Sequence, residues 1–66
     1  MTVVVNGQPR DVAEGASLDA LLTSLGLFPG SVVVERNGEV VRRDEFAQVR
    51  LKEGDRLEIV RFVGGG

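Results

Sequence analysis

The residues best suited to do chemistry are the last three in the sequence, Gly64-Gly65-Gly66, which follow the strand-like segment Arg61-Phe62-Val63. Glycine has no Cβ, so a glycine run can pass through a channel that is too narrow for any side chain. From Phe62 to Gly66, an extended chain spans roughly 17 Å, enough to place a terminal carboxylate inside the active site of another protein. Because a carboxylate is a poor electrophile, a partner would have to activate it, most simply by adenylation with ATP.

The glycine run also has a simpler interpretation. Chain ends are commonly disordered, and a glycine-rich end can serve as a linker. The run by itself therefore leaves both interpretations open, and the rest of the sequence has to decide between them.

The composition argues against an enzyme. The 66 residues make one domain, 1–66, and they contain no Cys, His, Tyr or Trp. Without His or Cys, a general base that works near neutral pH would have to be a strongly shifted carboxylate or Lys52, which is the single lysine. The absence of Cys also excludes disulfides and thiolate metal sites. We expect a module that other enzymes modify, with no metal site and no bound cofactor.

Charge and hydropathy place the chain among cytoplasmic globular domains. Hydrophobic residues make up 42% of the sequence, but no apolar run is long enough to span a membrane. The first residues lack the features of a secretion signal. The formal net charge of −2 gives no electrostatic footprint for nucleic acid. The expected partners are therefore proteins, and neither nucleic acid nor a membrane.

The N-terminal third predicts a hairpin. Val3-Val4-Val5 is a β-branched run, and Asn6-Gly7 is the dipeptide preferred in two-residue hairpin turns. A second strand should follow at about residues 8–12. Pro9 cannot donate a hydrogen bond to a neighbouring strand, which favours a position at the edge of the sheet.

One amphipathic helix follows. Ser17 is a good N-cap residue, and Gly26 stands where a left-handed C-terminal cap belongs. Between them, leucines recur at the helical spacing i, i+3, i+4 and i+7, namely Leu18, Leu21, Leu22 and Leu25. This stripe is typical of a helix that packs on the core of a small domain.

The second half predicts another hairpin and a core aromatic residue. Val32-Val33-Val34-Glu35 forms a strand that we expect at the centre of the sheet, although three consecutive valines leave its inward parity open. Asn37-Gly38 turns it into Glu39-Val40-Val41. A short helical turn should follow, with Phe46 filling the core beneath it.

Two further alternations end the chain. Val49 and Leu51 alternate with polar residues and predict a strand, and Leu57 and Ile59 predict another one after the turn at Gly54. Beyond Ile59 the apolar residues, Val60 and Phe62, fall on the parity that had been polar. The strand either bulges or exposes these two side chains as a docking patch; alternatively, Phe62 packs against the edge of the domain. The order of elements indicates an α+β fold with a helix on one face of a mixed sheet.

These residues resemble a known family. The layout is similar to the ubiquitin-like β-grasp fold, with a mixed four- to five-stranded sheet and one main helix across one face. The sequence resembles the sulfur carrier proteins of thiamine thiazole biosynthesis (ThiS type). The matching pieces are Val5-Asn6-Gly7, Gly15-Ala16-Ser17-Leu18 with Leu21-Leu22, Val34 to Val41, Gly54 to Val60, and Phe62-Val63-Gly64-Gly65-Gly66.

The resemblance implies a carrier cycle in which the protein is a co-substrate. An adenylating enzyme of the ubiquitin-E1 type (ThiF type) would activate the Gly66 carboxylate with ATP, and sulfur from a donor such as a cysteine desulfurase would displace AMP. The thiocarboxylate would then donate sulfur to thiazole synthase (ThiG type). Within a flexible tail, residues 62–66, Gly64 and Gly65 would thread the active site of the partner.

In the same scheme Val60, Phe62 and Val63 would dock the partner, and the free protein would be a monomer. Related carriers share such a tail, so a carrier for molybdopterin synthesis or tRNA thiolation remains an alternative. A ubiquitin-like interaction domain that binds without covalent chemistry is a second alternative, because it would share the fold and need no free carboxylate.

Overall fold

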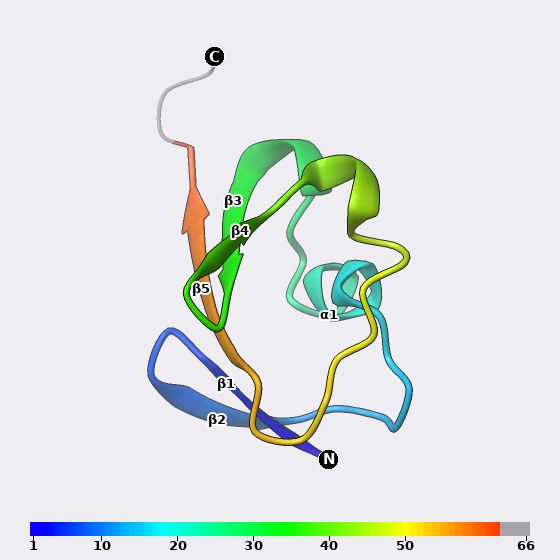
Figure 1. Cartoon of the computed structure of the whole chain (residues 1–66). Coiled ribbons are helices and arrows are strands. Elements are labelled where there is room, and N and C mark those ends of the chain that lie inside the picture. Colours follow the sequence, from blue (N-terminus) through cyan, green and yellow to red (C-terminus); the bar gives the residue numbers. More distant parts are fainter. Residues whose placement is uncertain (63–66) are drawn as a thin grey trace.

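One mixed sheet carries the fold, and α1 packs across one of its faces (Figure 1). The computed structural model describes residues 1–62. The elements in chain order are β1 (Thr2–Val5), β2 (Gln8–Asp11), α1 (Leu18–Ser24), a 3₁₀ turn (Pro29–Ser31), β3 (Val32–Arg36), β4 (Glu39–Val41), a second 3₁₀ turn (Arg43–Glu45) and β5 (Arg56–Arg61). The strand order is β2-β1-β5-β3-β4, in which β1 and β5 are parallel and all other neighbours are antiparallel. The α+β prediction is confirmed.

Both predicted hairpins form at their Asn-Gly turns. Asn6 and Asn37 have φ values of +49° and +52°, and the glycine that follows each also has positive φ. Turns of this kind match the twist of the two strands that they join. Pro9 lies in β2, at the edge of the sheet, as its missing N–H group predicted.

The helix begins and ends where the sequence predicted. The Ser17 hydroxyl oxygen accepts a hydrogen bond of 3.0 Å from the Ala20 N–H, which satisfies one of the free amides of the first turn. Gly26 has a φ of +73°, the left-handed conformation of a helix C-terminal cap. Three of the four leucines in the stripe, Leu18, Leu21 and Leu22, are buried.

The core lies between this leucine stripe and the inward face of the sheet. Each inner strand contributes two alternate residues, and Phe46 closes the core beside them. The buried sheet residues are Val3 and Val5 from β1, Val32 and Val34 from β3, and Leu57 and Ile59 from β5. The inward parity of β3, which the valine run left open, is therefore Val32 and Val34. Phe46 is buried, as predicted.

Two expectations about the strands were wrong. Residues 49–52 do not form a strand of the sheet. Arg50 makes only an isolated bridge with Ser17. The backbone there bonds to the loop before α1 instead, and the alternation arises because Leu51 packs into the core. The centre of the sheet is β5, whereas β3 lies between β5 and the edge strand β4.

The asparagines of both hairpin turns also hold β5 in place. The Asn6 side chain accepts a 2.8 Å hydrogen bond from the Ile59 N–H and donates a 3.1 Å bond to the Ile59 carbonyl. Asn37 accepts from the Arg56 N–H through its side chain at 2.9 Å and donates its own N–H to the Arg56 carbonyl at 2.8 Å. Both hairpins are therefore tied to the same central strand.

Asp55 joins the start of β5 to the β3–β4 turn. Its buried carboxylate accepts hydrogen bonds from Asn37 Nδ2 at 3.1 Å, the Lys52 N–H at 2.8 Å and Arg36 Nε at 3.0 Å. Burial by itself would raise the pKa of Asp55, but these three hydrogen bonds and the charge of Arg36 together hold the pKa below its ordinary value of 3.8. The ionised form of Asp55 is thus the one that stabilises the fold.

We predict that Asp55→Asn lowers the free energy of unfolding at pH 7 by about 1–3 kcal/mol, because a charged acceptor is lost from a buried network. The folded-state pKa is lowered, so the stabilisation is present above the unfolded-state pKa and is lost as the pH falls through the folded-state pKa. Urea unfolding across this acid range should show the gap between wild type and variant narrowing below about pH 4. Asp44→Asn is the control, since its ion pair with Arg42 is exposed to solvent. A gap independent of pH would contradict the prediction.

Candidate functional site

The site predicted from the sequence begins where β5 ends. Arg61 pairs with Val32, and the Phe62 N–H donates a 2.9 Å hydrogen bond to the Ser31 carbonyl. The sheet therefore fixes the chain as far as Phe62. Val63, Gly64, Gly65 and Gly66, which the sequence assigned to docking, threading and sulfur carriage, lie outside the described residues, and those roles stay predictions.

Val60 and Phe62 lie on the outer face of the sheet, away from α1. Residues 57–61 of β5 continue in register with residues 32–36 of β3. With no bulge in this pairing, the alternation turns Val60 outward. Both side chains are 62% exposed, which confirms the prediction of two exposed apolar residues. The alternative in which Phe62 packs against the edge of the domain is wrong at this exposure.

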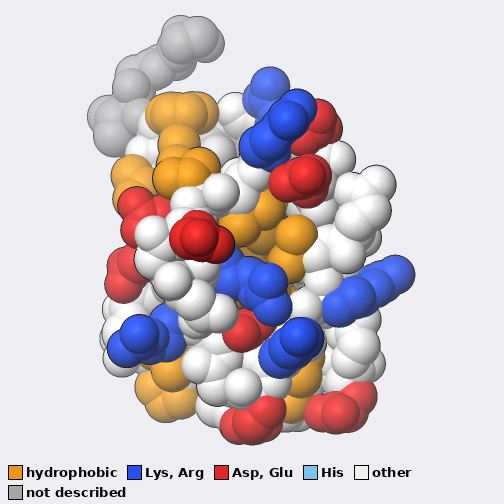
Figure 2. Space-filling view, in the orientation of Figure 1, with side chains coloured by type: hydrophobic (Ala, Val, Ile, Leu, Met, Phe, Trp, Pro, Cys, Tyr) orange, Lys and Arg blue, Asp and Glu red, His pale blue; other side chains and the backbone are white. Residues whose placement is uncertain are grey.

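Two further valines complete an apolar patch on this face. Val33 pairs directly with Val60, and Val40 of the neighbouring strand β4 is 66% exposed. Beside them, a shallow hollow of about 400 Å³ is bordered by Val33, Val40 and Phe62. Figure 2 shows hydrophobic side chains gathered over the C-terminal end of β5. We call Val33, Val40, Val60 and Phe62 the apolar patch.

Val33 and Val40 were not among the docking residues predicted from the sequence. Three consecutive valines in β3 gave no signal for which of them faces outward, and β4 is too short for its alternation to be read. The missing information was the pairing of β3 with β5 and β4, which decides that both side chains share a face with Val60.

Acidic side chains border the apolar patch along β3 and β5, whereas Arg42 and Arg43 line the hollow beside it. Glu35 of β3 lies directly opposite Glu58 of β5, two residues along the strands from the Val33–Val60 pair and on the same face. Like charges directly opposite each other destabilise a sheet. A partner that covers the patch would therefore gain from a basic side chain at this border.

The described part of the molecule offers surfaces for binding. Within residues 1–62, no group of three or more acidic, His or Cys side chains is arranged to hold a metal ion. In the same range, the buried carboxylate of Asp55 is occupied by three hydrogen bonds. No helix among these residues is long and apolar enough to cross a membrane.

The comparison with known families decides the classification. The sequence model of the ThiS family matches residues 3–66. The chain belongs to the ThiS family. A crystal structure of the thiamine biosynthesis protein ThiS from Geobacter metallireducens superposes with a TM-score of 0.84 at 40% identity, and the alignment covers the whole of both chains. The resemblance seen in the sequence and the β-grasp fold are thereby confirmed.

Three curated relatives extend this classification. The sulfur carrier protein ThiS of Bacillus subtilis is 42% identical over 50 residues, which is 76% of each chain. Two thiazole synthases, from Paramagnetospirillum magneticum and Magnetococcus marinus, are 46% and 44% identical over all 66 residues. The chain spans only 20% of the length of each synthase. In those two proteins a ThiS-like region is therefore part of a much longer polypeptide.

We predict that Phe62→Ala changes the free energy of unfolding by less than about 1 kcal/mol, because most of the side chain is already in contact with water. Phe46→Ala is the matched control. It removes the same side chain from a site that is only 2% exposed, and it should cost about 3–5 kcal/mol. Thermal and urea unfolding of both variants would measure the difference. A loss for Phe62→Ala close to that for Phe46→Ala would show that Phe62 is part of the core.

Proposed function

We propose that this ThiS-family chain is a sulfur carrier of thiamine biosynthesis and not itself an enzyme. The observation that carries the proposal is the match of the family model through residue 66, which includes the terminal glycines. The Bacillus subtilis relative, named a sulfur carrier protein, supports it. The composition agrees, because a chain without His or Cys has few groups for catalysis at neutral pH.

The proposed chemistry takes place at the carboxyl group of Gly66. An oxygen of the carboxylate attacks the α-phosphorus of ATP in the active site of an E1-like enzyme of the ThiF type, and pyrophosphate leaves. The terminal sulfur of a persulfide, formed by a donor such as a cysteine desulfurase, then adds to the acyl carbon, and AMP leaves. A thiol cleaves the resulting S–S bond reductively and frees the thiocarboxylate. ATP belongs to the partner, and the chain itself holds no cofactor.

The apolar patch is the proposed docking surface for the partner. Its residues lie around the end of β5, where the sheet holds the chain at Arg61 and Phe62. The Asn6–Ile59 hydrogen bonds and the pairing with β3 fix this end, so docking on the patch also fixes where the tail starts. Because the start of the tail is already held in place, ordering it on binding costs less conformational entropy. Gly64 and Gly65 would then enter a passage too narrow for a side chain.

Thiazole synthase is the proposed sulfur acceptor. Two proteins named thiazole synthase each contain a region similar to this whole chain. A carrier region and its acceptor within one polypeptide favour an acceptor of the same kind for the present chain. We also propose that the cycle runs in the cytoplasm and that the free carrier is a monomer.

We predict that incubation with ATP, a ThiF-type enzyme and a sulfur donor adds about 16 Da, the difference between one sulfur and one oxygen atom, to the C-terminal peptide. Deleting Gly66, or replacing Gly65 by Trp, should abolish this gain and leave the fold intact, because neither change touches a residue of the described core. Intact-mass spectrometry with a control that lacks ATP makes the measurement. An intact-mass measurement of the protein purified from its native host would test whether Gly66 carries a free carboxyl group there. A normal gain in either variant would refute the assignment.

We also predict that Phe62→Ala weakens binding to the ThiF-type enzyme by about tenfold or more, since an exposed aromatic side chain in an apolar patch is a typical binding hot spot. Phe28→Ala is the matched control, because Phe28 is 77% exposed and lies outside the apolar patch. Isothermal titration calorimetry of both variants would compare their affinities. Equal losses for the two variants would contradict the location of the docking surface.

A further inference from the structure

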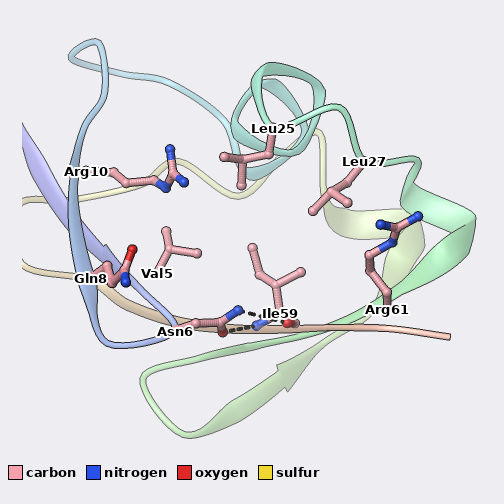
Figure 3. A pocket seen from close by; sticks show the side chains of 8 residues that line it. All are labelled: Val5, Asn6, Gln8, Arg10, Leu25, Leu27, Ile59 and Arg61. Atoms are coloured by element: carbon pink, nitrogen blue, oxygen red, sulfur yellow. Dashed lines mark hydrogen bonds between the residues drawn. The ribbon is translucent and has the colours of Figure 1, made fainter. Parts of the chain in front are cut away.

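A second hollow lies on the inner face of the sheet, between the end of α1 and the β1–β2 hairpin (Figure 3). Its volume is about 380 Å³. Val5 and Ile59 form one wall, and Leu25 and Leu27 form the wall opposite. Arg10 and Arg61 lie at its two ends. We call this hollow the arginine cleft.

The cleft is open because β2 brings polar residues to the inner face. Gln8 pairs with Val5 and Arg10 with Val3, so the side chains of Gln8 and Arg10 share the face of two core valines. The helix ends at Ser24 and does not cover them. The wall formed by Leu25 and Leu27 therefore stays partly accessible beside two cationic ends, while Val5 and Ile59 lie at the buried base of the cleft.

The charges in the cleft are of one sign. None of the residues that line it is acidic. Within residues 1–62, neither Arg10 nor Arg61 takes part in an ion pair or a side-chain hydrogen bond. The Asn6 amide is already occupied by Ile59. As far as the described residues go, two guanidinium groups thus have no side-chain partner around an apolar surface, in a chain whose formal net charge is −2.

These features fit an occupant that combines an apolar side chain with carboxylates. The guanidinium group binds carboxylates through two parallel hydrogen bonds, and arginine is enriched at binding hot spots. Arg61 immediately precedes Phe62, which belongs to the apolar patch on the opposite face. A protein that covers the patch and receives the tail therefore reaches Arg61 as well. A polypeptide segment, which can carry both apolar and acidic side chains, therefore matches the apolar walls and the two arginines better than a free anion does.

We propose that the arginine cleft binds an acidic segment of thiazole synthase, with an apolar side chain between the walls and carboxylates on Arg10 and Arg61. The inference rests on the proposed function, since it takes the synthase as the acceptor of the sulfur. The synthase is the partner of choice because two relatives join a region like this chain to a synthase in one polypeptide. The ThiF-type enzyme is the alternative occupant that the experiment separates from it.

The test is charge reversal in the full chain. Arg10→Glu and Arg61→Glu should each weaken binding to purified thiazole synthase by about tenfold at low salt, and the difference should shrink at high salt. Arg56→Glu is the matched control, because it makes the same charge change on β5. The Arg56 side chain lies on the outer face of the sheet, two residues from Glu58. This variant should stay within about twofold of wild type. Circular dichroism confirms that every variant is folded.

Thiocarboxylate formation by the ThiF-type enzyme, read by intact mass, is measured on the same variants. Weaker synthase binding with a normal mass gain supports the proposal. Unchanged synthase binding in both variants overturns the proposal. If synthase binding is unchanged and the mass gain falls, the cleft is assigned to the ThiF-type enzyme instead. A failure of the proposed function is seen separately, as the absence of any mass gain in the wild-type chain.

Discussion

The parallel pairing of β1 with β5 is the constraint on which the rest of the structure depends. Its backbone hydrogen bonds, from the Val4 N–H to the Asp55 carbonyl and from the Asn6 N–H to the Leu57 carbonyl, join segments some fifty residues apart. The Asn6 side chain continues the ladder to Ile59. Each hairpin can form locally at its Asn-Gly turn. This pairing attaches the β1–β2 hairpin to β5, to which β3 of the other hairpin is also paired, and so completes one sheet. The loop-closure entropy that it costs is offset by the core that it completes.

Because side chains alternate along a strand, the C-terminal end of β5 presents two different faces. Val60 and Phe62 point away from α1 into the apolar patch, whereas Ile59 and Arg61 point to the arginine cleft. The same strand thus carries an apolar surface on one side and a cationic one on the other, a few residues before Gly66, which is proposed to carry the sulfur. A rigid strand sets both surfaces at a constant position relative to the start of the tail, and a loop at the same point in the chain would not.

The sequence predicted the features that local chemistry determines. Positive φ at Asn6 and Asn37, the Ser17 cap and the leucine stripe depend on neighbours within one or two turns, so residue types were enough. The break in alternation after Ile59 located two residues of the apolar patch for the same reason. Features that depend on pairing between distant strands were missed. Val33 and Val40 join the patch through the register with β5 and β4, and Arg10 reaches the cleft through its pairing with Val3. Leu51 gave a false strand signal because burial on one side imitates the period of a strand.

A carrier that serves two enzymes in turn has to bind each of them well enough to react and loosely enough to leave. If one surface made every contact, a change that favours one partner would strengthen the other complex as well, since specificity is a difference between two affinities. Two surfaces that meet at the end of β5 remove this coupling. In the proposed cycle the apolar patch contributes to both complexes, while the charges of Arg10 and Arg61 add to the one whose partner is acidic at that point. Because ionic contacts at an exposed cleft act strongly on association rates, such a division favours encounter with the acceptor without making its complex slow to dissociate.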